Sequence, residues 1–142
     1  MLTTGFVLIK ITSVPLHPEP IVNSIRKDDN GAIITFIGTV RNTSQDGNKV
    51  TFLEIAPRGK DAEAKLKEVE TDICQKWQLQ DIAIYRRVGR LKVGEIALVV
   101  AISAPHRQEA FQACQYAVDM IKQGKITTEK DIYETSGSPT RS

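Results

Sequence analysis

A lysine on the apolar side of a helix is the first residue whose position suggests chemistry. The spacing of apolar residues predicts an amphipathic helix over 106–122. Its apolar stripe consists of Ala110, Phe111, Cys114, Val118 and Ile121. At about 100° per residue, Lys122 projects within roughly 40° of Val118 and Phe111. A partly desolvated ammonium group suits proton transfer or the stabilisation of an anionic intermediate. The structural alternative is a lysine whose stem extends past the helix end, where a cation complements the helix dipole.

The start of the same helix carries a second candidate group, in the sequence Pro105-His106-Arg107. The first turn of a helix presents unpaired backbone N–H groups and the positive end of the helix dipole. Together with an imidazole and a guanidinium, these groups form a suitable phosphate site. The alternative is a surface arginine beside a histidine that packs against the preceding strand.

Further cations are candidates for anion binding. Arg41 follows a buried strand and opens a polar, turn-rich loop over 41–49, which we expect to be mobile and which is a common place for a ligand-binding side chain. Lys125 and Lys130 follow Lys122 closely, so these lysines together can surround an anion. Each of these cations is also consistent with a solvated position on the surface.

The length of helix 106–122 limits how its two ends can cooperate. Arg107 and Lys122 are fifteen residues apart, so a straight helix separates them by about 22 Å. One small-molecule site cannot use both ends of the same helix. If both ends contribute to a site, one of them comes from a second copy of the chain, which predicts a homodimer with shared sites.

The elements that must position these residues follow from apolar periodicity and from turn signals. Amphipathic spacing predicts helices over 61–77 and 105–122, and Pro20, a residue tolerated at the first helical position, predicts a short helix over 21–27. Alternating or β-branched runs predict strands over 6–11, 32–40, 50–55, 81–88, 96–104 and 130–134, with a turn over 89–95. This order predicts an α+β fold in which helices pack against a largely antiparallel sheet. We expect one domain over 1–135 and a frayed tail over 136–142.

Composition excludes several classes of function. The 19 Lys and Arg residues nearly balance the 17 Asp and Glu residues, for a net charge of +2, so no global field attracts the chain to nucleic acid or to a membrane. Apolar runs such as 96–102 are too short to cross a bilayer, and the N-terminus lacks the pattern of a secretory signal. We therefore expect a cytoplasmic protein without nucleic acid or membrane partners.

Two cysteines and two histidines are too few and too scattered for a metal centre. Cys74 and Cys114 lie 40 residues apart, both inside predicted helices. Structural metal sites use clustered ligands, which this sequence does not offer. We expect both thiols to be buried and to behave as small hydrophobic groups, and we expect no metal ion.

Three motifs in the same order resemble those of the large subunit of molybdopterin synthase. They are the strand end Gly-x-Val-Arg-Asn within 31–42, the turn Arg-Val-Gly-x-Leu-x-Val-Gly-Glu over 87–95, and the helix start Ala-x-His-Arg over 104–107. In the third motif, a lysine follows the histidine by sixteen residues. The resemblance extends over most of residues 6–134.

This resemblance implies a fold, a reaction and partners. The fold is an α/β-hammerhead-type domain with an additional antiparallel β-sheet. The reaction converts cyclic pyranopterin monophosphate to molybdopterin by adding the two dithiolene sulfurs, without a metal or an organic cofactor. The sulfur arrives as a thiocarboxylate on the Gly-Gly tail of a small ubiquitin-like sulfur-carrier subunit. The resemblance also implies a homodimer at the centre of a heterotetramer.

The resemblance further assigns roles to particular residues. Lys122 matches the essential lysine beside the thiocarboxylate, and Arg41 matches the arginine of the pocket, with Thr39 and Val40 beside it. His106 and Arg107 match the pair that binds the pterin phosphate from the neighbouring protomer.

The segment 126–134 departs from the family pattern. Ungapped counting places Glu129 where the family has a second functional lysine. A shift of one residue brings Lys130 to that position, and we assign Lys130 the catalytic role. Glu129 and Asp131 on either side are assigned to substrate binding, and a late arginine contact falls on Arg141. The departure leaves open a non-catalytic dimeric paralogue that binds a ubiquitin-like partner or a pterin.

Overall fold

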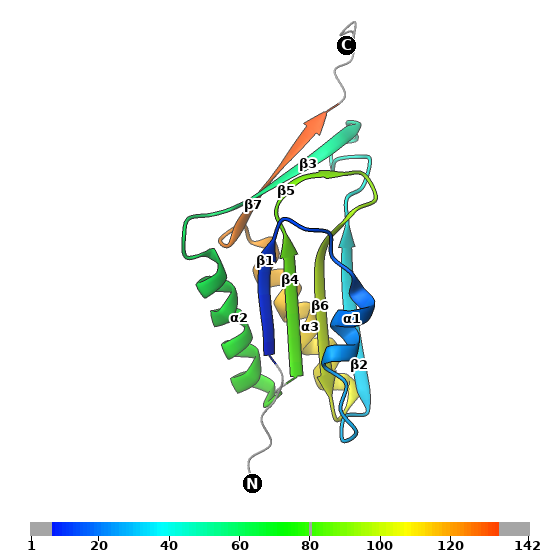
Figure 1. Cartoon of the computed structure of the whole chain (residues 1–142), viewed down its shortest axis with the longest axis vertical. Helices are drawn as coiled ribbons and strands as arrows, with labels where there is room; N and C mark the ends of the chain where they lie inside the picture. Colours follow the sequence, from blue (N-terminus) through cyan, green and yellow to red (C-terminus); the bar gives the residue numbers. More distant parts are fainter. Residues whose placement is uncertain (1–6, 80, 134–142) are drawn as a thin grey trace, which may run out of the picture.

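The computed structural model describes residues 7–79 and 81–133, which form two β-sheets and three helices (Figure 1). In chain order these elements are β1 (Val7–Thr12), α1 (Pro18–Ser24), β2 (Ala32–Thr39), β3 (Val50–Pro57), α2 (Ala62–Trp77), β4 (Asp81–Arg87), β5 (Gly89–Lys92), β6 (Ile96–Ala104), α3 (Arg107–Lys122) and β7 (Thr127–Tyr133). The predicted α+β class is confirmed. The tail 136–142, with Arg141, lies outside the described residues.

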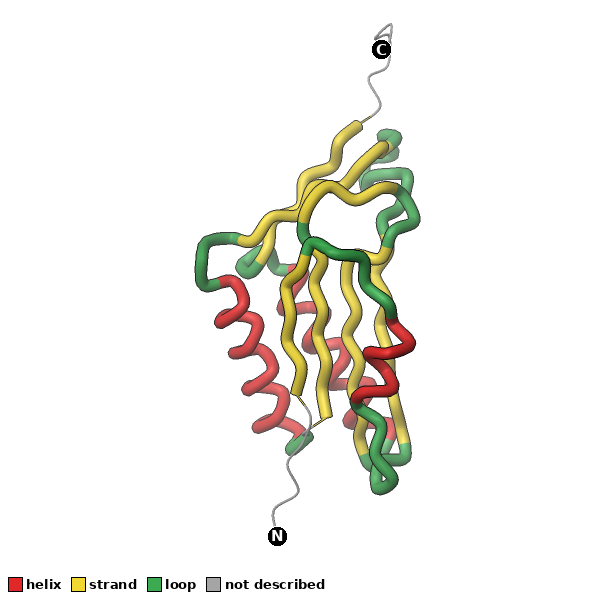
Figure 2. Tube along the Cα trace, in the orientation of Figure 1, coloured by secondary structure: helices red, strands yellow, loops and turns green. Residues whose placement is uncertain are grey.

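The strands form a four-stranded and a three-stranded sheet. The larger sheet has the order β1-β4-β6-β2, in which β1 and β4 are parallel and the other neighbours are antiparallel. The smaller sheet has the order β5-β3-β7 and is antiparallel throughout. Figure 2 shows this smaller sheet beyond one end of the larger sheet. The larger sheet is the helix-covered sheet that periodicity predicted, and the smaller one is the additional antiparallel sheet that the family resemblance implied.

Helices cover both faces of the four-stranded sheet. Side chains alternate along a strand, so Ile82 and Ile84 of β4 pack toward α2 and α3, whereas Ala83 packs toward α1. Figure 1 shows α1 on the side of the sheet opposite α3. Full burial of one isoleucine contributes roughly 1.5–3 kcal/mol to stability. The core on the α2 and α3 side therefore fixes the position of α3, whose two ends carry the candidate residues.

The buried face of α3 differs from the predicted stripe. It consists of Ala110, Ala113, Cys114, Ala117 and Ile121, and these small side chains let the helix approach the sheet closely. Phe111 is 58% exposed and Val118 is only partly buried. At about 100° per residue, Phe111 and Lys122 lie roughly 100–120° from Ala110, on the flank of the helix. Lys122 therefore borders the core and does not point into it.

Several boundaries differ from the predicted ones because pairing or proline placement overrides local pattern. Helix α1 begins at Pro18, since a proline in the first turn lacks only an N–H that has no helical partner. The segment 89–92, predicted as a turn, forms β5 because it pairs with β3. Pairing with β3 also extends β7 back to Thr127. The ends of the predicted strands at Phe6 and Glu134 lie outside the described residues.

The two cysteines differ in burial. Cys114 is buried as predicted, and burial raises the pKa of its thiol to about 11. Cys74 is only partly buried, and its Sγ donates a hydrogen bond to Glu70 Oε2 at 2.7 Å. Burial, followed by the contact with Glu70, raises the pKa of Cys74 to about 12. Both thiols are therefore protonated at neutral pH. No three His, Cys, Asp or Glu side chains gather in a metal-binding arrangement within residues 7–79 and 81–133.

In the same part of the chain, the helices are all too short or too polar to span a membrane.

Gly31 precedes β2 and lies against the start of α3. A Cβ at this position would stand 2.9 Å from the carbonyl oxygen of Pro105, a backbone atom that cannot move without displacing the first turn of α3. We expect Gly31→Ala to lower the free energy of unfolding by about 1–3 kcal/mol. Urea denaturation followed by the fluorescence of Trp77, the only tryptophan of the chain, measures this change.

Gly38→Ala is the matched control. Its added Cβ would meet the ring end of Phe36 at 3.1 Å, and a side chain can rotate away. We expect a loss below about 1 kcal/mol. Equal losses in the two variants would contradict the close packing of Gly31 on Pro105.

Candidate functional site

A pocket of about 760 Å³ lies where the end of α3 meets the two sheets. It is lined by Gly38, Thr39, Val40, Arg41, Thr43, Ser44, Gln45, Asp46, Leu53, Ala97, Lys122, Glu129, Asp131 and Tyr133. These residues come from the end of β2, the loop that follows it, β3, β6, the last residue of α3 and β7. The structure thus brings together most of the predicted site residues, although Thr39 and Asp131 lie 92 positions apart in the sequence.

A β-bulge directs the end of β2 into the pocket. The pairing of β2 with β6 shifts between Gly38 and Thr39, so that Ala97 of β6 is an extra residue between the partners of those two. Val40 is buried and is held by two backbone hydrogen bonds, from Val40 N to Glu95 O at 3.0 Å and from Gly94 N to Val40 O at 2.7 Å. Arg41 follows this fixed residue. It has no hydrogen bond or ion pair with any described residue, so its guanidinium is available to a ligand.

The loop 41–49 expected to be mobile is closed by its own hydrogen bonds. Ser44 N donates to Asn48 O at 2.9 Å, and Val50 N donates to Asn42 O at 2.8 Å. A single bridge joins Thr43 and Lys49. The loop therefore forms a defined rim of the pocket next to Arg41.

Lys122 reaches the pocket from the C-terminal end of α3. Its Nζ donates a hydrogen bond to Glu129 Oε2 at 3.1 Å, and its side chain is 46% exposed. The partial desolvation that the sequence suggested is therefore small in the single chain. A cation at the end of α3 also complements the helix dipole, as the structural alternative proposed. Lys122 thus lies at the end of the helix and also lines the pocket, and its role in proton transfer stays a prediction.

The alternation of β7 decides which of its side chains enter the pocket. Glu129, Asp131 and Tyr133 line it, and Lys130 between them does not. Lys130 pairs in register with Glu54 of β3, and these two residues lie on the opposite face of the small sheet from Asp131 and its partner Leu53. The structure therefore does not bring Lys130 to the pocket. A shift of one residue along a strand moves a side chain to the other face, and the pairing with β3 places Glu129 on the pocket face.

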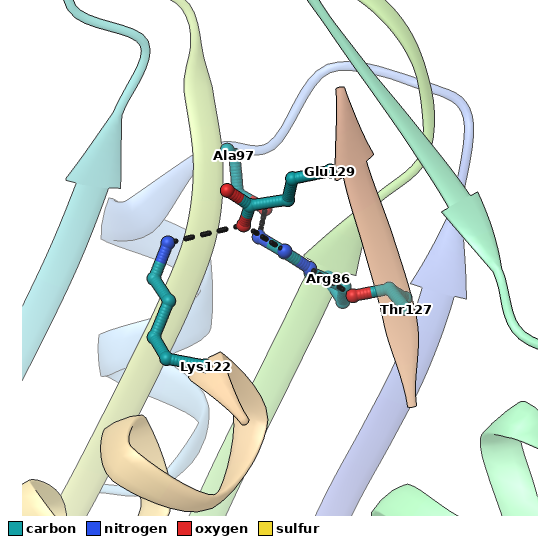
Figure 3. A network of polar contacts seen from close by, with 5 residues as sticks. All are labelled: Arg86, Ala97, Lys122, Thr127 and Glu129. Atoms are coloured by element: carbon teal, nitrogen blue, oxygen red, sulfur yellow. Dashed lines mark hydrogen bonds and ion pairs between the residues drawn. The ribbon is translucent and has the colours of Figure 1, made fainter. Parts of the chain in front are cut away.

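Behind Glu129 lies a buried arginine that the sequence analysis did not identify. Arg86 is 1% exposed, and its Nη2 donates to Glu129 Oε2. Its Nε donates to Thr127 Oγ1 at 3.1 Å and its Nη1 to Ala97 O at 3.3 Å. Figure 3 shows these contacts, with the Glu129 carboxylate between Arg86 and Lys122. One sequence signal exists, because Arg86 continues the alternation of Ile82 and Ile84 on the buried face of β4.

The charge of Glu129 is stabilised by its neighbours. Burial opposes ionisation of its carboxyl group, but the hydrogen bond and the charge of Arg86, together with Lys122, outweigh this effect and hold the pKa below its ordinary value. The Glu129 side chain is 32% exposed. Its carboxylate therefore contacts the buried Arg86 on one side and faces the pocket on the other. At neutral pH the pocket wall therefore carries an alternating series of charges from Arg86 through Glu129 to Lys122.

The predicted phosphate-binding turn lies at the other end of α3. His106 and Arg107 contribute to a second pocket of about 770 Å³, together with Gly31, Ala32, Pro105, Gln108, Phe111 and Gln112. The His106 side chain is 80% exposed, with its Nδ1 3.7 Å from Glu109 Oε1, so it does not pack against the preceding strand. Arg107 is exposed as well. One chain thus separates the two groups of candidate residues by the length of α3, as the spacing predicted.

The charges of the first pocket do not by themselves favour an anion. Arg41 and Lys122 line it, but so do the carboxylates of Asp46, Glu129 and Asp131. Two cations against three carboxylates leave a formal charge of −1 on the lining (+2 − 3), and the buried Arg86 behind Glu129 brings the sum to zero. The lining of the pocket in one chain therefore carries no net positive charge to attract an anion.

Comparison with known proteins places this α+β fold and its pocket in a family. The family model described as "MoaE protein" matches residues 11–124. The molybdopterin synthase catalytic subunit of Bacillus subtilis (strain 168) is 38% identical over 125 residues, which cover 88% of this chain and 79% of that protein. The chain belongs to the MoaE family, and the resemblance seen in its motifs is confirmed.

Solved structures agree with this assignment. The crystal structure of molybdopterin synthase from Staphylococcus aureus aligns with a TM-score of 0.82 and 31% identity, over 89% of this chain and 92% of that one. A chain from the complex of subunits 1 and 2 of molybdopterin-converting factor from Helicobacter pylori 26695 aligns with a TM-score of 0.59 over 93% of this chain and 90% of that one. At 16% identity, the second likeness shows the fold alone.

The ion pair between Arg86 and Glu129 predicts a stability that depends on pH. Replacing Glu129 by glutamine removes a charged acceptor from a buried guanidinium, so we expect a loss of about 1–3 kcal/mol at pH 7. Because the pKa of Glu129 is lowered from its ordinary value of 4.5, its contribution is present above about pH 4.5 and is lost as the pH falls through the folded-state pKa. The difference between wild type and Glu129→Gln should therefore shrink on acidification. Urea denaturation at pH 7 and pH 3 measures it, and an equal difference at both pH values would contradict the ion pair.

Proposed function

We propose that this chain is the catalytic subunit of a molybdopterin synthase, which transfers sulfur from a thiocarboxylated small subunit to cyclic pyranopterin monophosphate. The observation that carries the proposal is the placement of Arg41 and Lys122 in one pocket between the two sheets, in a chain of the MoaE family. In this proposal the reaction takes place in the cytoplasm and the chain acts as one domain over 1–135. It needs no metal or organic cofactor.

The pocket residues then have distinct roles. The Gly-Gly tail of the small subunit lies along the end of β2, beside Thr39 and Val40, and Arg41 holds the thiocarboxylate by charge-assisted hydrogen bonds. Its sulfur attacks a carbon of the precursor and displaces an oxygen, whose C–O bond breaks and which leaves with a proton. The new C–S bond links the small subunit to the pterin as a thioester. Water then releases the small subunit as a carboxylate and leaves the sulfur on the pterin. Lys122 transfers protons in these steps and stabilises the acyl intermediate. Asp131 and Glu129 contribute to the wall of the same site.

The missing positive charge comes from a second copy of the chain. The substrate and the sulfur donor are both anionic, whereas the lining of the pocket in one chain carries more carboxylates than cations. His106 and Arg107 form an exposed phosphate-binding turn that lies about 22 Å from Lys122 of the same chain. A homodimer in which this turn faces the pocket of its partner supplies the charge to both sites. A small ubiquitin-like subunit at each end completes a heterotetramer.

One observation favours a second candidate function. Glu129, and not a lysine, occupies the pocket face of β7, which is the expectation for a dimeric paralogue that binds a ubiquitin-like partner or a pterin without catalysis. Mixing the purified chain with a thiocarboxylated small subunit and the cyclic precursor separates the two functions. Formation of the dithiolene supports the enzyme, and binding of both partners without dithiolene supports the paralogue.

Lys122 and Lys130 should respond differently to substitution. Lys122→Ala removes the ammonium group from the pocket, and we expect turnover to fall by roughly 10²- to 10⁴-fold, the usual contribution of a general acid–base group. Lys130→Ala changes a side chain on the opposite face of β7, and we expect less than about a threefold change. Rates of dithiolene formation measure both, and size-exclusion chromatography checks that each variant keeps the oligomeric state of the wild type. A large loss in Lys130→Ala with a small loss in Lys122→Ala would reverse the two assignments.

Mixed dimers test whether each site is shared between protomers. A purified heterodimer of Lys122→Ala with Arg107→Ala has one site with both changes and one intact site, if Lys122 of one protomer works with Arg107 of its partner. We then expect about half of the wild-type turnover per dimer, although each variant alone is nearly inactive. If both residues serve a site within one chain, every site of the heterodimer is damaged and no activity returns.

A further inference from the structure

We infer that Arg86 and Glu129 form a positioning unit that holds the ammonium group of Lys122 in the pocket. The inference rests on the proposed function, because it concerns how the group assigned to proton transfer is held in place. In this role neither Arg86 nor Glu129 contacts the reacting atoms. The two residues act through Lys122.

The geometry of Arg86 makes it a fixed support. Its guanidinium is almost fully buried, and its three hydrogen bonds reach three separate acceptors, on β6 and β7. A planar guanidinium with donors in fixed directions is fully determined by three such contacts. The acceptor on β6 is the carbonyl oxygen of Ala97, the extra residue at the β-bulge that also directs Arg41 into the pocket. The β-bulge at Ala97 thus helps to fix the positions of both Arg86 and Arg41.

Glu129 transmits this fixed position to Lys122. A single oxygen, Oε2, accepts hydrogen bonds from both Arg86 Nη2 and Lys122 Nζ, the latter at 3.1 Å. The other carboxylate oxygen has no hydrogen-bond partner among the described residues. A lysine side chain has four rotatable bonds and loses about 2 kcal/mol of conformational entropy when it is held in one geometry. A free Lys122 at the exposed end of α3 would therefore sample many positions, and the carboxylate restricts it to the pocket wall.

The charges favour this role over direct binding of an anion by Glu129. A carboxylate repels the thiocarboxylate and the phosphate, so Glu129 cannot replace a second lysine as an anion-binding group. The buried Arg86 behind it offsets this charge and keeps the carboxylate ionised, as its lowered pKa indicates. The unit therefore fixes Lys122 without adding net charge to the pocket.

Two variants separate positioning from other roles. Glu129→Gln keeps the size of the side chain but removes the charge that joins Arg86 to Lys122. Arg86→Lys keeps the buried charge but loses the directional donors, so it tests the geometry with less risk to folding. Glu54→Gln is the matched control, because Glu54 pairs with Arg90 at 2.7 Å on the opposite, exposed face of the same small sheet.

The first readout is the reactivity of Lys122 toward acetic anhydride, a small neutral reagent, measured by mass spectrometry on the folded chain. The ion pair with Glu129 must open before the amine reacts. We expect Glu129→Gln to raise the acetylation rate of Lys122 roughly three- to tenfold, with a smaller rise in Arg86→Lys. The rate at Lys130 in the same molecules, and the rate at Lys122 in Glu54→Gln, should stay unchanged. An unchanged rate at Lys122 in Glu129→Gln overturns the inference.

The second readout is the division of the kinetic effect between kcat and KM. Loss of positioning lowers kcat, on the order of tenfold in Glu129→Gln, and leaves KM for the cyclic precursor within about twofold. An unchanged kcat, or an effect confined to KM, overturns the role in the reaction. If the acetylation rates change as expected but no chain, wild type included, forms the dithiolene, the positioning unit stands and the proposed function fails.

Discussion

The buried guanidinium of Arg86 is the constraint on which the site depends. A charged group that is almost fully removed from water is stable only when its donors are paired and its charge is offset. Arg86 meets this condition by binding Thr127 and Glu129 of β7 and the carbonyl oxygen of Ala97. Because Arg86 belongs to the four-stranded sheet and β7 to the three-stranded one, the same contacts join the two sheets. The pocket lies at this junction. The hydrogen bonds that satisfy the buried charge of Arg86 therefore also hold the walls of the pocket together.

In the proposed function, the chemistry of the pocket uses residues of a second chain. The single positive charge of Arg86 is offset by the carboxylate of Glu129. The formal charges of the other lining residues also cancel, so the lining does not attract an anion by its net charge. The turn at His106 and Arg107, which the proposal assigns to phosphate binding, is exposed at the other end of α3, about 22 Å from Lys122 of the same chain. The length of α3 separates the two groups of candidate residues, and the proposed site therefore combines one group from each of two chains. The same helix, which packs on the core, also sets the distance between the two groups in the proposed dimer.

Local sequence pattern predicted the features that depend on periodicity. The order of elements, the burial of Cys114 and the positions of Arg41 and Lys122 follow from the period of a strand or a helix and from the residue that ends it. The resemblance to the family added proposed roles for these residues. The features that were missed depend on tertiary pairing. Strand β5 forms only because β3 accepts it, and the pairing of β7 with β3 places Glu129 in the pocket and Lys130 outside it. Arg86 was not identified as a site residue, because its acceptors on β7 lie more than 40 positions away in the sequence.

A crystal structure of the chain with the cyclic precursor bound tests the central claim most directly, because it shows which chains surround one ligand. The account predicts that the phosphate group contacts Arg107 of one protomer while the pterin lies within reach of Lys122 of the other. A phosphate held only by residues of the chain that supplies Lys122, with Arg107 of the partner far from it, would contradict the account.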